Sequence, residues 1–394
     1  MLRRGVYRRG FAVSAFVLIL WLGSAIAATY VVGPDSEEDP IQATISRASE
    51  GDRIIVKSGH YLENINVTKK LALIGLDTGE GSPLIDADEV GSAVIISSDG
   101  VMFEGFEVTN SGRLWKDAGI KVISKNCIIR DNDIKGNYYG IVLDGAEGGN
   151  VLRNFVCNND VGISIYTSQR CTIAENSACN NTFGGILLSK ASNNSIRNNN
   201  ASLNQWAGII LGESSNNSIT NNIARYNENE GIWLLRSASN TIRGNKVRYN
   251  YIFGIRLLYS ARNAVSSNTV RDNLDGISLE SSNGNIVAGN NLSYNDFGIY
   301  VDNSFNNRIY MNNIINNVQN AYSWNSTNCW NSTDRLTYIY NVVQYRRYLG
   351  NHWSGYFGRD DFGDGLGDGP QMISERDRDY SPLKKPSENY AIQG

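Results

Sequence analysis

The sequence predicts an all-β fold, a right-handed parallel β-helix, and three observations support this prediction. The 394-residue chain contains 50 Asn, which suits a fold that repeats one Asn-bearing turn many times. The dipeptide Gly-Ile recurs every 21–23 residues across positions 119–298. Two columns of Asn run in phase with it, across positions 132–312 and 137–317. Three columns in phase over roughly 200 residues indicate a solenoid of about thirteen coils.

Each unit of 22–23 residues reads as three short strands separated by turns. After Gly208 and Gly276 the first and third residues are apolar, which is the two-residue period of a strand with one buried face. Apolar positions around Ile219 and Val247 predict the second and third strands. Gly and Asn suit the corners because they tolerate left-handed backbone conformations. The crossover rule for parallel strands gives the right hand.

Residues 28–320 are expected to form the β-helix, and residues 321–394 a separate C-terminal cap with an Asp/Gly-rich loop, because the period fails between them. Asp39-Pro40-Ile41-Gln42 predicts a helix start, with Asp as N-cap, Pro as the first helical residue and Gln as the third. Ile41, Ile45 and Ala48 then share one helix face. This helix is expected to cover the open apolar end of the coil stack.

The first 27 residues read as a secretory signal peptide that is cleaved near Ala27. Residues 1–10 are basic, residues 11–22 form an apolar run, and Ala25-Ile26-Ala27 is an A-x-A site. An uncleaved anchor is the alternative, although the run is short for a membrane span. No later stretch is apolar enough to span a membrane, so we expect a secreted, cell-surface or periplasmic protein. Its formal charge of −3 argues against nucleic-acid binding, which needs a basic surface.

Further motifs lie outside the regular repeat. They are Gly59-His60-Tyr61-Leu62-Glu63-Asn64-Ile65, Leu73-Ile74-Gly75, Gly105-Phe106, and a C-terminal stretch running from Leu349-Gly350-Asn351-His352-Trp353-Ser354 to Asp379-Tyr380-Ser381-Pro382-Leu383. With the Gly-Ile/Asn repeats, they make the chain resemble the NosD-like family of exported parallel β-helix proteins, also called the carbohydrate-binding and sugar-hydrolysis (CASH) type. The C-terminal stretch is similar to that of archaeal surface proteins. The resemblance covers nearly the whole mature chain and implies fold and export rather than a particular activity.

The name of that family implies a periplasmic copper-binding accessory of nitrous oxide reductase assembly, but the residues argue against copper. Soft copper sites need clustered Cys, Met or His. The chain has only His60 and His352 and no C-x-x-C pair, and Cys127 and Cys171 occupy the same repeat position two coils apart. We therefore expect no copper site.

Cys157 and Cys179 occupy the same repeat position on adjacent coils, three residues after an Asn of the first column. Neighbouring strands lie ~4.8 Å apart, which is within the reach of a disulfide. Such a bond is stable in an exported protein, because the environment outside the cytoplasm is oxidising. The alternative is a pair of stacked free thiols.

The residue two after each Gly forms an outward column that is rich in apolar and aromatic side chains. Its members are Val142, Ser164, Leu187, Ile210, Trp233, Arg256, Ser278 and Tyr300. Exposed apolar stripes mark interaction surfaces, and aromatic faces suit sugar rings. Trp206, Trp233 and Tyr300 are therefore the candidate carbohydrate-binding residues. The alternative is that a loop or the C-terminal segment covers this strip.

Four residues after each Gly, a second column places Glu280 and Asp302 on adjacent coils. Carboxylates ~5 Å apart have the spacing of a retaining glycosidase, and Arg256, one coil earlier, is suited to holding an acidic sugar. Glu280, Asp302 and Arg256 are therefore the candidate catalytic residues. A calcium site shared with Asp275 and an ordinary solvated surface neutralised by Arg256 are the alternatives.

Asp360, Asp364 and Asp368, with interleaved Gly, resemble an oxygen-ligand calcium loop. Phe362 stands where such a loop usually has Asp, and the Glu that closes an EF-hand is missing. The alternative is an acidic turn without a metal.

The sequence as a whole predicts a non-catalytic surface or periplasmic rod that binds a polysaccharide or a surface glycoprotein along one face. A lyase or hydrolase acting on acidic polysaccharide is the second hypothesis, and the copper-assembly accessory is the third. Phosphate-binding loops, dinucleotide fingerprints and nucleophile elbows do not occur in a fitting context.

Overall fold

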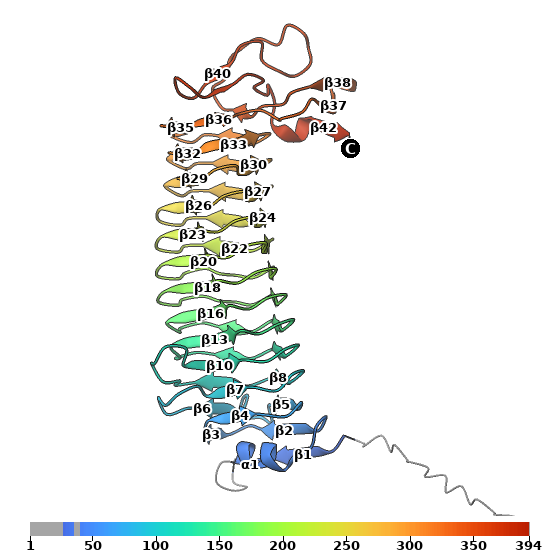
Figure 1. Ribbon diagram of the computed structural model, residues 1–394, viewed down its shortest axis with the longest axis vertical. Coiled ribbons are helices and arrows are strands. Elements are labelled where there is room, and N and C mark those ends of the chain that lie inside the picture. The colour runs from blue at the N-terminus through green and yellow to red at the C-terminus, as the bar shows by residue number, and fades with distance from the viewer. Residues whose placement is uncertain (1–26, 35–39, 394) are drawn as a thin grey trace, which may run out of the picture.

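The computed structural model describes residues 27–34 and 40–393, which form an elongated rod of stacked coils (Figure 1). The rod is a right-handed parallel β-helix of about thirteen turns, which confirms the predicted fold class. Helix α1 (Pro40–Arg47) lies at its blue, N-terminal end, and the C-terminal segment lies at its red end. The expected signal peptide, apart from Ala27, and the expected N-cap Asp39 lie outside the described residues.

Three faces of parallel strands, named A, B and C, enclose the core. Face A is β1 (Thr29–Val32), β2 (Arg53–Lys57), β5 (Ala72–Leu76), β8 (Met102–Glu104), β11 (Ile128–Arg130), β14 (Asn150–Leu152), β17 (Thr172–Ala174), β19 (Ser195–Arg197), β21 (Ser218–Thr220), β24 (Thr241–Arg243), β27 (Ala264–Ser266), β30 (Ile286–Ala288), β33 (Phe305–Tyr310) and β36 (Thr327–Cys329). Face C is β4 (Ile65–Val67), β7 (Val94–Ile96), β10 (Ala118–Val122), β13 (Tyr139–Asp144), β16 (Val161–Tyr166), β18 (Gly184–Ser189), β20 (Ala207–Gly212), β23 (Glu230–Leu235), β26 (Phe253–Leu258), β29 (Asp275–Glu280), β32 (Phe297–Asp302) and β35 (Gln319–Trp324).

Face B consists of two sheets that lie one above the other along the rod. The first is β3 (His60–Leu62), β6 (Leu84–Asp86), β9 (Glu107–Thr109), β12 (Asp133–Ile134) and β15 (Phe155–Val156). The second is β22 (Ile223–Arg225), β25 (Lys246–Arg248), β28 (Thr269–Arg271), β31 (Asn291–Ser293), β34 (Asn313–Ile315) and β39 (His352–Trp353). Parallel bridges at Ser177 and Asn200 connect the two sheets, so face B is continuous.

The core consists of aliphatic columns that run along the rod. Strand alternation turns every second side chain inward, and the parallel register places equivalent residues of successive coils side by side. On face C, for example, Ile186, Ile209 and Ile232 are register partners and are fully buried. Each such side chain contributes roughly 1.5–3 kcal/mol by burial. The columns therefore hold the coils together without any helix between them.

Both predicted Asn columns form buried amide ladders, at the corner between faces A and B and at the corner between faces B and C. In the first ladder the backbone N–H and the Nδ2 of Asn199 both donate to Oδ1 of Asn222, at 2.9 and 3.0 Å. Asn222 repeats the same pair of bonds to Asn245 at 2.9 and 3.1 Å, and its Nδ2 also donates to the carbonyl of Ile196. The ladders satisfy polar backbone groups at the buried corners.

A third ladder, which the sequence analysis did not identify, runs along the corner between faces C and A. Its members are Asn194, Asn217, Asn240, Asn263, Asn285, Asn307 and Asn328. A column of Ser hydroxyls accompanies it, for example where Ser260 Oγ accepts the N–H of Ser237 at 3.0 Å. All three corners of the central coils are therefore closed by amide ladders.

Two buried aspartates end the first and the third ladder at the C-terminal end of the rod. Asn351 takes the place that follows Asn312, and the carboxylate of Asp379 accepts its backbone N–H at 2.7 Å. The carboxylate of Asp377 accepts the N–H of Asn328 at 2.7 Å at the end of the third ladder. The last position of a ladder needs acceptors and no further donor, which matches the two oxygens of a carboxylate.

Helix α1 closes the opposite end, as predicted. Ile41 and Ile45 are buried, and Ala48 just beyond the helix is buried with them. The first N–H groups of the helix are capped from another coil, since the Glu63 carboxylate accepts those of Ile41 and Gln42 at 3.1 and 2.9 Å. The Gln42 side chain accepts the backbone N–H of Asn66.

The stacked strands continue past residue 320, where the sequence placed the start of the cap. β35 pairs with β32 and β36 with β33, and β39 pairs with β34 after an excursion of the chain. The excursion contains the antiparallel strands β37 (Leu336–Tyr340) and β38 (Val343–Arg347), and β42 (Ala391–Gln393) pairs with β37. A small hairpin follows from β40 (Gln371–Met372) and β41 (Arg378–Asp379), and a short 3-10 helix spans Ser387–Asn389. The last coil is thus completed by residues far apart in the chain.

Candidate functional site

The outer surface of face C carries most of the residues that the sequence analysis selected. Most of them lie in three columns: directly before each Gly of the Gly-Ile pairs, two residues after it and four residues after it. Trp206 lies two residues before Gly208, at the edge of the same face. The middle column is not exposed throughout, because Val142 and Ile210 are only 1% and 4% exposed and Ser278 is buried. The half-buried members that reach the surface are Leu187, Trp233, Arg256 and Tyr300. The expected continuous apolar strip is therefore broken into separate patches.

The first patch is a row of aromatic rings on three adjacent coils. The rings of Phe183 and Trp206 have centroids 5.0 Å apart, and those of Trp206 and Trp233 lie 6.3 Å apart with an interplanar angle of 11°. Trp206 is 39% exposed, and its Nε1 donates to Glu230 at 3.1 Å, which fixes the plane of its ring. The two tryptophans that the sequence predicted as sugar-binding residues are thus brought together.

The third predicted aromatic residue, Tyr300, belongs to a second patch further along the rod. Its ring stacks on that of Tyr322 with centroids 5.2 Å apart, and the ring of Phe297 lies edge-on to both. Face C therefore offers two aromatic surfaces, the Phe183/Trp206/Trp233 row and the Phe297/Tyr300/Tyr322 cluster, with charged residues between them.

Arg256 lies between the two aromatic patches and is bound by two carboxylates. Its Nε and Nη2 donate to both oxygens of Glu280 at 2.8 and 2.9 Å, and its Nη1 donates to Glu230 at 3.2 Å. Glu230 is 3% exposed, and burial raises its pKa although Arg256 and Trp206 act in the opposite direction. The guanidinium of Arg256 is thus engaged by both Glu230 and Glu280, and its binding of an acidic sugar stays a prediction.

Glu280 and Asp302 lie on adjacent coils, as their repeat position predicts. They are register partners of β29 and β32, and neighbouring parallel strands are ~4.8 Å apart. Glu280 is held by Arg256 and by the hydroxyl of Ser278 at 3.0 Å, whereas Asp302 accepts a bond from its neighbour Asn303. One carboxylate of the pair is therefore neutralised and the other faces solvent.

Asp275 is the least satisfied acid of this surface. It lies in the column before Gly, between its register partners Phe253 and Phe297, and is 7% exposed. No hydrogen bond to its carboxylate is found among the described residues. Burial first, and then the charge of Glu280, raise its pKa to about 6, while Arg256 opposes the shift. A carboxyl in this environment is able to hold a proton near neutral pH.

The sequence analysis missed Glu230 and considered Asp275 only as a calcium ligand. Both directly precede a Gly, and the outward columns were counted only from the residues after Gly. The available signal was weak, because the same column also holds Val161, Ala207 and Phe253. A search for charged residues at repeat positions that are apolar in most coils would have identified Glu230 and Asp275.

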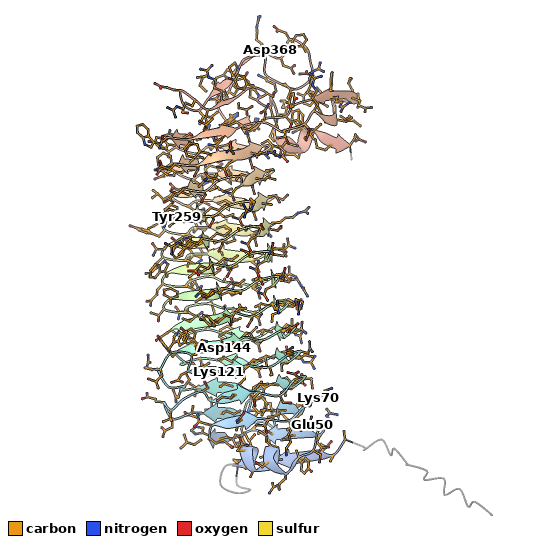
Figure 2. All side chains as sticks on the ribbon, viewed as in Figure 1. Glu50, Lys70, Lys121, Asp144, Tyr259 and Asp368 are labelled. Carbon is orange, nitrogen blue, oxygen red and sulfur yellow. A yellow bond between two sulfur atoms is a disulfide. The ribbon has the colours of Figure 1, made fainter. Side chains whose placement is uncertain are left out.

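The Asp/Gly-rich loop lies at the far C-terminal end of the rod, where Asp368 is labelled in Figure 2. Asp360 accepts the backbone N–H groups of Asp364 and Gly365, and Asp368 accepts that of Asp361. The Asp364 carboxylate faces Arg347 at 3.3 Å. Over the described ranges, no group of three His, Cys, Asp or Glu is placed to hold a metal ion. These carboxylates shape turns in the structure, and calcium binding stays a prediction.

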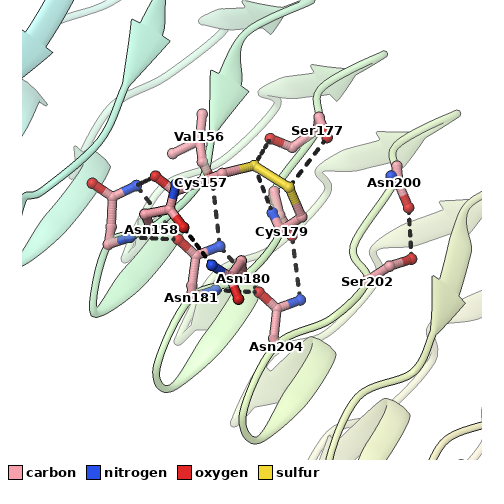
Figure 3. The surroundings of a disulfide bond; sticks show 12 residues. Val156, Cys157, Asn158, Ser177, Cys179, Asn180, Asn181, Asn200, Ser202 and Asn204 are labelled. Carbon is pink, nitrogen blue, oxygen red and sulfur yellow. Dashed lines mark hydrogen bonds between the residues drawn. A yellow bond between two sulfur atoms is a disulfide. The ribbon is translucent and has the colours of Figure 1, made fainter.

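Cys157 and Cys179 are joined by a disulfide between adjacent coils at the corner of faces B and C (Figure 3). In Figure 3 the bond lies beside the amide ladder that contains Asn181 and Asn204. Cys127 and Cys171 are buried free thiols. The sequence left open whether Cys157 and Cys179 form a disulfide or are stacked free thiols, and the structure contains the disulfide.

Comparison with known proteins places the chain in a family. The model of a family described as "Periplasmic copper-binding protein (NosD)" matches residues 46–235 and 203–358, which is most of the chain. A relative from Pseudomonas aeruginosa, named as a probable ABC transporter binding protein NosD, is 30% identical over 120 residues. That match covers 29% of this chain and 27% of the relative. In the part of the chain that the structure describes, no helix is long and apolar enough to cross a membrane.

Several solved structures share the fold at low sequence identity. The Dettilon tailspike protein has a TM-score of 0.52 and 16% identity, over 70% of this chain and 66% of that chain. The A-module of the Azotobacter vinelandii mannuronan C-5 epimerase AlgE6 has a TM-score of 0.52 and 15% identity, over 75% and 86% of the two chains. The periplasmic alginate epimerase AlgG has a TM-score of 0.52 and 18% identity, over 70% and 82%. These likenesses show the β-helix fold.

Proposed function

The chain belongs to the NosD family of periplasmic copper-binding proteins, and on that premise we propose that it is a periplasmic rod that binds a polysaccharide along face C without cleaving it. The observation that carries the proposal is the Phe183/Trp206/Trp233 row. Its rings lie on adjacent coils, and Trp206 presents a partly exposed face whose orientation is fixed by its bond to Glu230. Such rigid, partly exposed aromatic groups contribute large contact area at a low cost in conformational entropy.

The geometry of face C suits a linear polymer rather than a small molecule. The coils repeat every ~4.8 Å along the rod, so equivalent side chains recur in a straight line. The two aromatic surfaces are separated by the coils that hold Arg256 and Asp275. A chain of sugars lying along the rod would contact both aromatic surfaces and the polar residues between them. Two of the structurally similar proteins are named as a mannuronan C-5 epimerase and an alginate epimerase, but these likenesses show the fold alone.

The family description includes copper, and the described residues do not fit a copper site. His60 Nε2 lies 3.0 Å from Asp86, and His352 Nδ1 lies 3.2 Å from the carbonyl of Leu383, near the two opposite ends of the rod. The buried thiols of Cys127 and Cys171 contact backbone carbonyls. Soft metals need several clustered N and S ligands. Copper therefore has no part in the proposed function.

The test is retention of the mature protein in gels that contain neutral or acidic polysaccharides. We expect at least one polymer to retard the protein, and Trp206→Ala combined with Trp233→Ala to weaken the interaction at least about tenfold. Tyr380→Ala removes an exposed aromatic ring from the C-terminal segment and serves as the control. Retardation that survives in the double tryptophan variant would exclude the Phe183/Trp206/Trp233 row as the binding surface.

A second candidate function, hydrolysis or lysis of a polysaccharide, is favoured by one observation. Among the described residues Asp275 is buried without a hydrogen bond to its carboxylate, and burial and the charge of Glu280, at the other end of β29, raise its pKa to about 6. This combination of a protonated acid and nearby carboxylates is the arrangement that glycosidases use. New chain ends that appear with the wild type and disappear in Asp275→Asn and in Asp302→Asn would establish an enzyme. Binding without new chain ends supports the rod as a binding protein.

A further inference from the structure

Face B carries a column of arginines that the proposed function does not use. Arg225, Arg248 and Arg271 are register partners on β22, β25 and β28. Like charges stacked on adjacent parallel strands repel one another. The coil does not require them, because the same position holds Ser202 one coil earlier and Ser293 one coil later. Three stacked guanidinium groups therefore need an explanation other than folding.

Within the described residues, two of these arginines have no anionic partner. Arg271 pairs with Asp272 at 2.6 Å, but no ion pair of Arg225 or Arg248 is found among the residues that the structure describes. The Nε of Arg248 is buried and lacks any hydrogen-bond acceptor. Lys246, on the same strand as Arg248, adds a further exposed cation without an ion pair within the described part of the chain. This surface is locally basic although the whole chain carries a formal charge of −3.

Parallel tyrosine rings border the arginine column at the corner between faces B and C. The rings of Tyr226 and Tyr249 stack with centroids 5.1 Å apart and an interplanar angle of 6°. Each guanidinium lies near the ring that follows it, at 5.8 Å for Arg225 and 5.9 Å for Arg248. Both rings are exposed, as is that of Tyr251 beside them.

These tyrosines line a shallow groove of about 550 Å³, together with Asn227 and Glu228. The groove offers ring faces for apolar contact, and the arginine column supplies positive charge beside it. Glu228 is the one acid among the lining residues, and it would repel an anionic group placed over it. An anionic ligand is therefore directed toward the arginine side of the groove.

We propose that this surface, the Arg225/Arg248/Tyr226/Tyr249 strip, binds an anionic polysaccharide that carries a carboxylate on its sugars and lies along the rod. A planar guanidinium matches a carboxylate with two parallel hydrogen bonds. The tyrosine faces accept the apolar faces of the sugar rings between the carboxylates. The coil repeat supplies one guanidinium per coil, so a regular polymer meets successive cations as it runs along face B. This site is separate from the aromatic row of face C.

The test measures binding of galacturonic acid oligomers to the full mature protein by calorimetry, at low and at high salt. We expect saturable binding that weakens with salt, because screening reduces charge attraction. Arg225→Gln combined with Arg248→Gln should weaken binding by about tenfold for each guanidinium removed. The matched control is Arg153→Gln with Arg170→Gln, which removes the same charge from arginines paired with Asp131 and Glu147.

The expected pattern also includes weak or absent binding of uncharged galactose oligomers of equal length. Equal uronate binding by the wild type and the Arg225/Arg248 variant, or no uronate binding at low salt, would overturn the proposal. A stronger interaction with single-stranded RNA than with uronate oligomers would overturn it as well, by showing a nucleic-acid site. Trp206→Ala with Trp233→Ala should leave uronate binding unchanged, so failure here is distinguishable from failure of the face C proposal.

Discussion

At the scale of single residues, the ladder Asn is the position that the fold depends on most. Asn222 is fully buried, donates to Ile196 and Asn245, and accepts two bonds from Asn199. Only a carboxamide offers both an acceptor and two donors in this small volume. The repeat made this role predictable from the sequence, because the Asn period persists where the other residues vary.

We predict that Asn222→Asp destabilises the rod strongly. A carboxylate at this position cannot donate to Ile196 and Asn245, and its charge is buried without a counter-ion. The free energy of unfolding should fall by about 3 kcal/mol or more, as measured by urea denaturation. Asn341→Asp, at an exposed turn, is the control and should stay within about 0.5 kcal/mol of the wild type.

We predict that Asp275 makes stability fall with pH. Its folded pKa is raised from 3.8 to about 6, by burial first and by Glu280 second. The unfolded chain therefore releases this proton at a lower pH than the folded protein does. The contribution of Asp275 to the free energy of unfolding is complete below about pH 4 and is lost as the pH rises through about 6. The loss is about 3 kcal/mol.

Urea unfolding at several values between pH 4 and 7 measures this contribution. Relative to wild type, Asp275→Asn should gain stability across that range, because its side chain does not titrate. Asp302→Asn removes a half-exposed carboxyl on the neighbouring coil and is the control. Stability curves of wild type and Asp275→Asn that run parallel with pH would refute the buried, proton-holding state of Asp275.

At the scale of elements, the sequence predicted the strands and two corners of each coil but not the third. The third ladder begins only at Asn194, and the same column upstream holds Cys127, Gly149 and Cys171. Its signal is therefore shorter and is interrupted by residues with no amide. The stacking of strands beyond residue 320 was not predicted for a related reason, since the last coil is closed by Asn351 from a distant segment rather than by the next repeat.

We predict a modest stabilisation by the disulfide that joins two coils. Cys157 and Cys179 close a loop with a sequence separation of 22. In the chain-entropy account, a loop of this size contributes about 3 kcal/mol. Cys157→Ser with Cys179→Ser should therefore lower the free energy of unfolding by up to this amount, measured against Cys127→Ser. An unchanged midpoint under oxidising conditions would show that the ladder bonds alone fix these coils.

At the scale of the whole molecule, the rod is a stack whose two ends need separate protection. Each coil contacts mainly its neighbours, so an uncovered end exposes apolar columns and unpaired strand edges. Helix α1 covers one end, and the segment that contains Asp377 and Asp379 covers the other (Figure 1). The sides are left free, with aromatic and acidic residues on face C and arginines on face B. The sequence alone did not predict which of these faces binds a ligand. The reason is that the charge available for binding depends on ion pairs such as that of Arg256 with Glu230.

We predict that ending the chain at Ser354 causes association or misfolding. This truncation keeps β39 but removes both Asp377 and Asp379, so two ladders lose their last acceptors. Size-exclusion chromatography should show aggregates or oligomers. Deleting only Ala391–Gln393, the edge strand of the small antiparallel sheet, should leave a monodisperse protein. A well-folded, unassociated product of the longer truncation would contradict the capping role.

The measurement that tests the central claim most directly is tryptophan fluorescence of the mature protein titrated with a panel of neutral and acidic polysaccharides. The account predicts a saturable change with at least one polymer, and its loss in Trp206→Ala combined with Trp233→Ala. The absence of any change across the panel, or a change that persists in the double variant, would contradict polysaccharide binding at the aromatic row of face C.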